Sequence, residues 1–194
     1  MPQRATRTLE SLKTLFEAKR GTVLPLTPSL ARLYGCLRMP RPRARPHVIS
    51  NFVTTLDGIV SLQVKGHSGG GDISGFDAQD RMVMGLLRAI ADVVIVGAGA
   101  LNADRRHVWT AETVFPELAA AYRQLREAMG KRRTPLNVVV SGNGKLDLRL
   151  PCLLYTSRRT RRAPLQALQD LPCRIAAPPH DEPARRIGNP QQQS

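Results

Sequence analysis

The sequence predicts a three-layer α/β/α fold, in which helices cover both faces of a mainly parallel β-sheet. Two short and almost continuous apolar runs, Val93–Val96 and Leu136–Val140, have the composition of strands buried on both faces of such a sheet. Helical periodicity before and between these runs supplies the alternation of strand and helix that is typical of α/β domains. The 194 residues are enough for one domain with a sizeable core.

The first predicted element is an amphipathic helix over residues 6–18. Its apolar residues recur at helical spacing and Gly21 follows as a stop signal. These apolar residues are Leu9, Leu12, Leu15 and Phe16. The segment Met39–Pro46 is rich in proline and arginine, which disfavour both a helix and an inner strand. We therefore expect residues 1–45 to form a docking helix and an exposed basic arm; an arm that grips phosphates is the alternative.

A strand is predicted over His47–Gly58, because this run is rich in β-branched and aromatic residues and closes on Asp-Gly, a turn signal. After the glycine-rich stretch Gly66–Gly75, apolar residues recur with the period of a helix that has one buried face. These residues are Val83, Leu86, Leu87 and Ile90. Ser74 and Asp77 are alternative caps for the first turn of that helix.

Beyond the strand at Val93–Val96, a further helix precedes the strand at Leu136–Val140. Its apolar residues are Val114, Leu118, Ala121, Leu125 and Met129. From Cys152 the sequence changes character, with a charge cluster, recurrent prolines and no further predicted strand. We expect a sheet that is incomplete at its C-terminal end and a non-homologous tail over residues 152–194.

The net charge of +14 raises the possibility of a nucleic-acid partner, but its distribution argues against a basic binding face. Residues 1–45 carry a net charge of +8, residues 46–151 carry +2 and residues 152–194 carry +4. The basic excess therefore lies mainly in the two flanks. A basic nucleic-acid-binding protein remains an alternative, although no aromatic residues are interleaved with the arginines of the flanks.

Composition also excludes several other classes. No apolar run approaches the roughly 18 residues that cross a bilayer, and no signal core follows the basic start, so a cytoplasmic protein is expected. The three cysteines and the four histidines show no metal-ligand spacing, so no metal site is expected and the cysteines are interpreted as unpaired thiols. They are Cys36, Cys152, Cys173, His47, His67, His107 and His180.

Three turns are candidates for ligand binding, because open α/β sheets bind ligands at the carboxyl ends of their strands. Thr54–Gly58 places two hydroxyls and a carboxylate at a strand end, Gly69–Gly75 leads into a helix, and Val96–Leu101 holds a Gly-x-Gly after a strand. Glycines let a backbone approach a ligand closely, and a helix N-terminus offers N–H groups to a phosphate. Each turn also has a plain interpretation as an ordinary turn or a flexible loop.

The order and spacing of TTLDG, DISG and LLRAIADVVIVGAGAL resemble the reductase domain of the riboflavin-biosynthesis deaminase-reductases and their stand-alone relatives. The resemblance covers about Pro46–Pro151, and no zinc-deaminase signature occurs. It implies a dihydrofolate-reductase-like, Rossmann-like fold and NADPH-dependent reduction of a phosphorylated ribosylaminopyrimidine to its ribitylamino product. It also implies a homodimer for the full-length family and no membrane partner. Reduction of another pterin or pyrimidine is an alternative, as is a domain that binds the cofactor without turnover.

The resemblance also assigns roles to individual residues. Asp57 takes the catalytic position, with a polar orienting role, and Arg88 pairs with the ribose phosphate of the substrate. The other substrate-side residues are Thr54, Thr55, Gly58 and Ser74. The cofactor-side residues are Asp72, Ile73, Gly97, Ala98, Gly99, Ala100, Asp104 and Ser141.

Two residues depart from the family pattern: Asp72 replaces the usual tryptophan and Ala100 replaces a common threonine, which would remove one hydroxyl contact to phosphate. Two others have plain alternatives, since Arg88 could be a solvated cation at a helix C-terminus and Asp104 a loop cap. The family's later strands and its Glu-Gly-Gly loop have no counterpart after Pro151. The sequence therefore predicts a truncated reductase with little or no activity.

Overall fold

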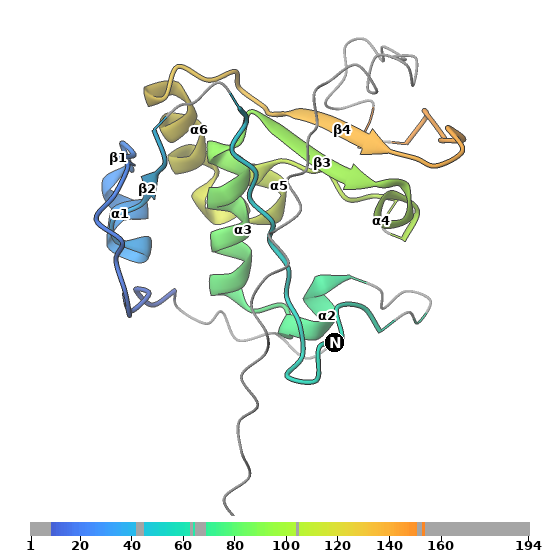
Figure 1. Cartoon of the computed structure of the whole chain (residues 1–194), viewed down its shortest axis with the longest axis horizontal. Helices are drawn as coiled ribbons and strands as arrows, with labels where there is room; N and C mark the ends of the chain where they lie inside the picture. The colour runs from blue at the N-terminus through green and yellow to red at the C-terminus, as the bar shows by residue number, and fades with distance from the viewer. Residues whose placement is uncertain are drawn as a thin grey trace, which may run out of the picture. The chain divides into compact units, whose positions relative to one another are not determined.

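The computed structural model describes residues 9–41, 45–62, 64, 69–103, 105–150 and 153 (Figure 1). These residues all belong to one compact unit, Met1–Thr160. The predictions for the tail beyond Cys152, including Cys173, concern residues outside the described part, apart from Leu153. Among the described residues no helix is long and apolar enough to cross a bilayer.

The two predicted strands form a parallel pair, β3 (Val93–Gly97) and β4 (Leu136–Val140). The register runs from Val93 opposite Leu136 to Gly97 opposite Val140. A parallel pair needs a long crossover, and here the chain between the strands supplies helices for it (Figure 1). The prediction of parallel α/β topology is confirmed for this pair, whereas the complete three-layer arrangement stays a prediction.

The helix predicted around Val83 and Ile90 is α3 (Ala78–Ile90). Asp77, not Ser74, is its cap, because the Asp77 carboxylate accepts hydrogen bonds from the backbone N–H groups of Gln79 and Asp80, each at 2.9 Å. The buried face of α3 packs against α5 (Ala111–Val114) and α6 (Ala119–Ala128). On that face Gly85 is required, since a Cβ there would lie 2.6 Å from the Tyr122 hydroxyl oxygen.

The prediction of one helix from Val114 to Met129 is wrong in its continuity. The chain forms α5, then the single 3-10 turn η1 (Pro116–Leu118), and only then α6. Pro116 explains the break, because a residue before proline is pushed out of the helical region, and Phe115 adopts φ −143° and ψ 84°. The apolar residues still face the core, so the periodicity correctly identified which side chains are buried.

The predicted N-terminal helix is absent from residues 9–18, which have no regular secondary structure. Leu9 and Leu12 pack against the core cluster, but Leu15 is 88% exposed. A short helix is stable only when its apolar face packs against the rest of the protein. Here a 2.7 Å hydrogen bond from the Leu12 N–H to the Leu33 carbonyl holds the segment in place instead. The segment lies beside α1 (Pro28–Tyr34).

Two short strands, β1 (Thr22–Val23) and β2 (Arg38–Met39), form an antiparallel pair near α1. Gly21, predicted as a helix stop, instead directly precedes β1 and has φ +91°. A Cβ on Gly21 would lie 2.3 Å from the Met39 carbonyl oxygen. Cys36 is exposed and forms no disulfide, as predicted for this thiol.

The predicted strand at His47–Gly58 is also wrong, because residues 47–55 are not assigned to any strand. Phe52 is 77% exposed, and no neighbouring strand pairs with this run within the described part of the chain. A strand needs a partner for its backbone groups, which explains why β propensity alone was not sufficient. The turn at its end is confirmed: Gly58 has φ +86° and its N–H donates to the Thr55 carbonyl at 3.0 Å.

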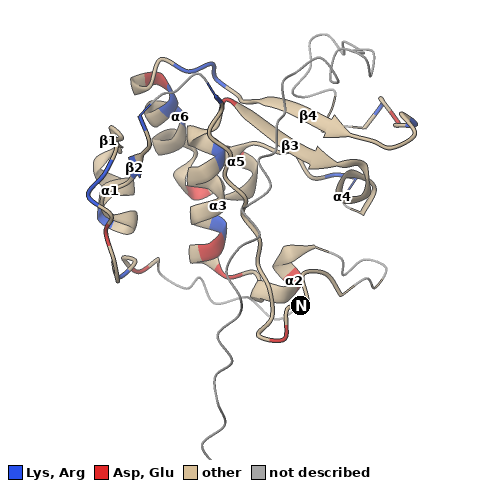
Figure 2. Ribbon diagram, in the orientation of Figure 1, with Lys and Arg blue, Asp and Glu red and all other residues tan. Residues whose placement is uncertain are grey.

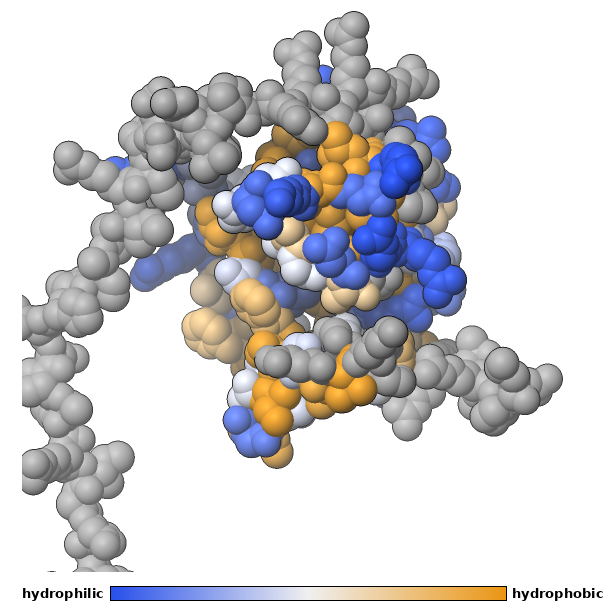
Figure 3. Space-filling view, turned by 90° about the vertical axis from the view of Figure 1, so that its right-hand side faces the viewer, coloured by the Kyte–Doolittle hydropathy of each residue, from blue (hydrophilic) through white to orange (hydrophobic). Residues whose placement is uncertain are grey.

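The strands β3 and β4 are not buried on both faces, which corrects another prediction. Val96 is buried, but Ile95 is 65% exposed and Leu136 is 59% exposed. Their side chains alternate along each strand, so one face of the pair packs on the protein and the other is open. Figure 3 shows apolar surface interrupted by polar side chains on the side of the molecule that lies to the right in Figure 1.

Candidate functional site

The Thr54–Gly58 turn is held by the side chain of Thr55. The Thr55 hydroxyl donates to the Asp57 carboxylate, and the Ile59 N–H donates back to the same hydroxyl oxygen at 2.9 Å. The Thr54 hydroxyl donates to the Thr55 carbonyl at 2.9 Å. Asp57 itself is exposed. The turn therefore fixes a carboxylate at its outer surface, where a ligand has access to it.

The glycine-rich stretch predicted as a loop contains the short helix α2 (Gly70–Ser74), which lies against this turn region. A Cβ on Gly70 would lie 2.9 Å from Cγ1 of Val53, so a glycine here lets the Val53 side chain lie close against α2. Asp72 and Ile73 are half-buried on α2. The Ser74 hydroxyl oxygen is buried and has no hydrogen-bond partner within the described residues. An unsatisfied buried hydroxyl is uncommon and marks a place where a ligand could bind.

The second group of predicted residues lies at the carboxyl edge of the parallel pair. Gly97 ends β3 and α4 (Ala98–Ala103) begins at once, so the predicted Gly-x-Gly turn is a strand-to-helix junction. Ser141 directly follows Val140, whose register partner is Gly97. The Ser141 hydroxyl accepts the Gly144 N–H at 3.1 Å and stabilises the turn after β4. Gly97 and Ser141 therefore lie at the same edge of the parallel pair, and their role in binding a cofactor stays a prediction.

The glycines of this junction are not explained by backbone strain or by packing. Neither Gly97 nor Gly99 has a positive φ, and a Cβ at either position would meet nothing within 4 Å. Gly99 and Ala100 are exposed, and Ala98 is half-buried. The plain interpretation, glycines that merely permit a tight turn, loses its support. Open space above the backbone fits a group that approaches it closely, as a dinucleotide does. Asp104 lies outside the described residues.

Arg88 lies apart from both groups, on the last turn of α3, and only 8% of it is exposed. Its alternative role as a solvated helix-terminal cation is therefore wrong. The guanidinium donates to Nε2 of His107 at 3.0 Å and to the Thr110 carbonyl at 3.4 Å, and it lies over the Trp109 ring at 5.2 Å. Burial lowers the pKa of Arg88 to about 10.

The sequence does not predict that Arg88 lies beside His107, Trp109 and Thr110. These three residues belong to no recognised motif, and they lie 19–22 residues from Arg88 along the chain, so the sequence gives no sign of the contact. The only usable signal was that Trp109 is the single tryptophan of the chain. Across the described residues, no hydrogen bond or ion pair links the Thr54–Gly58 turn to the edge formed by β3 and β4, so the predicted residues form three local groups.

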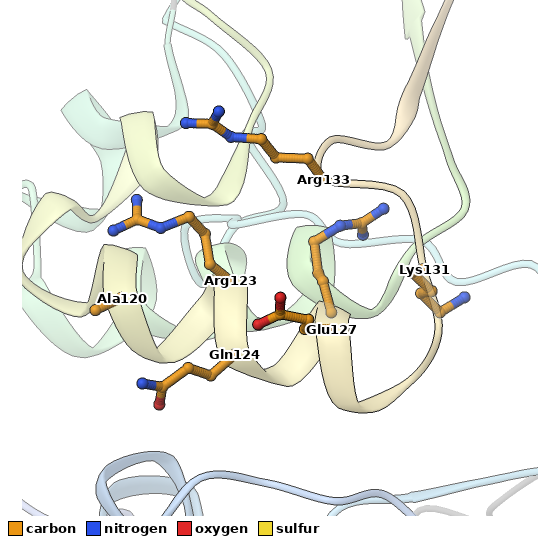
Figure 4. Close-up of a pocket in the computed structure, with 7 residues that line it drawn as sticks. Ala120, Arg123, Gln124, Glu127, Lys131 and Arg133 are labelled. Carbon is orange, nitrogen blue, oxygen red and sulfur yellow. The ribbon is translucent and has the colours of Figure 1, made fainter.

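A hollow in the described surface lies elsewhere, over α6 and the loop that follows it. Its volume is about 470 Å³. The lining is Ala120, Arg123, Gln124, Arg126, Glu127, Lys131 and Arg133. In Figure 4 the Arg123 and Arg133 side chains extend over the same side of the helix, whereas Lys131 points away. None of the predicted site residues lines this hollow, and Figure 2 shows that it belongs to a basic stretch between α6 and β4.

Comparison with known families gives one match. A family model described as the RibD C-terminal domain matches residues 46–176. The match begins where the motif resemblance begins and continues beyond Pro151, where that resemblance ends. The comparisons found no matching curated protein and no matching solved structure.

Proposed function

Because the chain belongs to the RibD C-terminal domain family, whose members are riboflavin-pathway reductases, we propose that its domain binds NADPH to reduce a phosphorylated ribosylaminopyrimidine. The observation that supports this most directly is the parallel pair of β3 and β4. It aligns the Gly97–Ala100 junction with Ser141 at one sheet edge. Such an edge is where open α/β sheets bind their ligands.

The residues present fit a dinucleotide. Gly97 and Gly99 leave open space above the backbone, and α4 begins directly beside them. In this proposal these residues, with Ser141, hold the cofactor, and Ala100 contributes backbone but no hydroxyl. When bound, the cofactor supplies the hydride that converts the ribosylamino group to a ribitylamino group.

The substrate side of the proposal uses the turn and α2. Thr55 orients the Asp57 carboxylate through its hydroxyl, so that Asp57 can accept a hydrogen bond from a polar group of the pyrimidine or its sugar. The buried Ser74 hydroxyl, which has no partner among the described residues, forms a hydrogen bond with the bound substrate in this proposal. Arg88 provides the positive charge for the phosphate. In this arrangement the protein contributes orientation and charge, whereas the redox chemistry belongs to the cofactor.

Cofactor binding is tested by titrating NADPH into the full chain and following the fluorescence of the reduced nicotinamide. We expect saturable binding that Gly99→Val weakens by about tenfold or more, equivalent to about 1.4 kcal/mol, because the new side chain fills the open space. Ala103→Val is the matched control, since it places the same side chain at the exposed last position of α4. Equal weakening by both variants, or no binding to the unmodified chain, overturns this proposal.

Turnover is a separate measurement. The open outer face of β3 and β4 leaves the sheet edge weakly supported. We therefore expect the chain to oxidise NADPH only slowly, or not detectably, when the ribosylaminopyrimidine phosphate is added. Substrate-dependent oxidation at about 1 s⁻¹ or faster, a rate ordinary for enzymes, contradicts the expected low activity but leaves the proposed reaction intact.

A further inference from the structure

Arg88 is a buried positive charge. It is almost fully buried, and no Asp or Glu forms an ion pair with it within the described part of the chain. The guanidinium contacts one imidazole nitrogen, one carbonyl and the Met84 sulfur. A guanidinium has five N–H donors, so this set leaves donor capacity unused. Buried charges are normally paired, which makes an anionic ligand the natural complement.

Two aromatic side chains hold this guanidinium in place. Arg88 Cζ lies 5.2 Å from the centroid of the Trp109 ring, within the range of a cation–π contact. Arg88 also donates to Nε2 of His107, and the imidazole in turn packs edge-on against Trp109 with ring centroids 4.5 Å apart. Because arginine is always a donor, Nε2 of His107 must be the acceptor, which places the ring proton on Nδ1.

The indole contributes a second unsatisfied donor. Nε1 of Trp109 is buried and has no hydrogen-bond partner among the residues that the structure describes. A buried indole N–H usually finds an acceptor. Arg88 and Trp109 are therefore adjacent groups that both have unused donor capacity, and an oxyanion is the class of ligand that such donors bind.

We propose that Trp109 and His107 are positioning residues that fix the Arg88 guanidinium for a phosphate monoester. This inference rests on the proposed function only in identifying the phosphate with that of the substrate. The Trp109 ring packs against one face of the Arg88 guanidinium, and His107 accepts one of its N–H groups, which therefore does not face the ligand. The remaining donors of Arg88 are then oriented before the phosphate arrives, which reduces the entropy lost on binding.

The test uses the single tryptophan as a local reporter. Inorganic phosphate and ribose phosphate are titrated into the full chain while the emission of Trp109 is followed, with ribose as the uncharged comparison. We expect both anions to change the emission saturably and ribose to have no effect. Arg88→Gln removes the response, whereas Arg81→Gln retains it. Arg81 is the matched control because it lies on α3 and also faces an aromatic ring, that of Phe115 at 5.9 Å.

The positioning role is tested by calorimetric phosphate titration of four variants. Trp109→Ala and His107→Ala are expected to weaken phosphate binding about fivefold or more. Trp109→Phe, which keeps a ring face, and His107→Gln, which keeps an acceptor, are expected to restore most of the affinity. Simple structural damage would not follow that order, and thermal unfolding of each variant identifies any that does not fold.

Two outcomes overturn the inference: the unmodified chain gives no saturable response to phosphate, or Trp109→Ala and His107→Ala bind phosphate as tightly as it does. The proposed function fails separately, by the absence of NADPH binding in the titration described above. A chain that binds phosphate through Arg88 but not NADPH would retain this inference and reject the reductase assignment.

Discussion

At the scale of single residues, the buried arginines and the close-packed glycine have the clearest physical roles. Arg126, only slightly exposed, donates to the carbonyls of Ala89 at 2.8 Å and Ala91 at 2.7 Å, at the end of α3. It also donates to the Arg132 carbonyl at 2.7 Å. Helix ends leave carbonyls without partners, and this side chain satisfies them from a neighbouring helix. Sequence periodicity could not predict this role, because it depends on how α6 packs against α3.

Arg126→Ala is expected to lower the free energy of unfolding by about 2–3 kcal/mol, because it leaves buried carbonyls without donors. Urea unfolding followed by circular dichroism measures the change. Arg123→Ala is the matched control, because Arg123 lies on the same helix and is exposed. It should change the free energy of unfolding by about 0.5 kcal/mol or less. Equal effects of the two substitutions would show that the carbonyl contacts contribute nothing.

Gly85→Ala is expected to destabilise the chain by about 1–3 kcal/mol, because the added Cβ meets the Tyr122 hydroxyl and ring at 2.6 and 2.7 Å. Thermal unfolding measures the loss. Combining it with Tyr122→Leu tests the cause: if the collision is responsible, the double variant is more stable than the sum of the two single changes predicts. If the two changes in the free energy of unfolding are strictly additive, the collision with Tyr122 is not the cause of the destabilisation.

Asp147 gives a pH dependence that can be measured at one residue. The Arg149 N–H and side chain, together with Arg105, hold the pKa of its carboxyl below the ordinary value. A carboxyl with a lowered folded-state pKa stabilises the fold above its unfolded pKa and loses that contribution as the pH falls through the folded value. An NMR titration should show the lowered pKa, and Arg149→Ala should raise it only part of the way toward the ordinary value, because the substitution removes the side-chain contact and keeps the backbone N–H. A pKa unchanged by Arg149→Ala would contradict the assignment.

At the scale of helices and strands, the sequence predicted those elements whose signals are local. The position of α3 and both strands of the parallel pair followed from periodicity and apolar runs. Pro116 interrupts the predicted long helix, because it excludes the preceding residue from the helical region. The predictions of a strand over His47–Gly58 and of an N-terminal helix are wrong for another reason: each element needs a packing or pairing partner, and local composition does not say whether one is present.

The cap of α3 is an element-scale prediction. Asp77→Ala removes the acceptor for the N–H groups of Gln79 and Asp80, and it should lower the free energy of unfolding by about 1 kcal/mol. Asp77→Asn keeps an acceptor oxygen and should retain most of the stability. Chemical denaturation of the three proteins measures the difference. A large loss in Asp77→Asn would mean that the negative charge, rather than the cap, is what stabilises the helix.

At the scale of the whole molecule, the candidate site could be predicted only in parts. The parallel pair brings Gly97, Gly99 and Ser141 to one sheet edge, because the carboxyl ends of parallel strands coincide whatever the rest of the fold does. It could not reveal the aromatic neighbours of Arg88, which come from a segment about 20 residues away along the chain, without a motif. Pairwise contacts of this kind depend on packing, and only the structure gives them.

The open face of the parallel pair leads to the last prediction. Val93 and Leu136 are register partners on neighbouring strands and both expose apolar side chains, and Ile95 is exposed two residues along β3 on the same face. An exposed apolar sheet face of this kind promotes association. We expect the purified chain to associate as its concentration rises, and Ile95→Thr to reduce that association with little loss of stability. Val96→Thr is the matched control: Val96 is buried one residue along the same strand, so its substitution should destabilise the fold and increase association. Light scattering over a concentration series, with thermal unfolding of each protein, separates the two effects. If Ile95→Thr associates as readily as the unmodified chain, the open sheet face is not the surface through which the molecules meet.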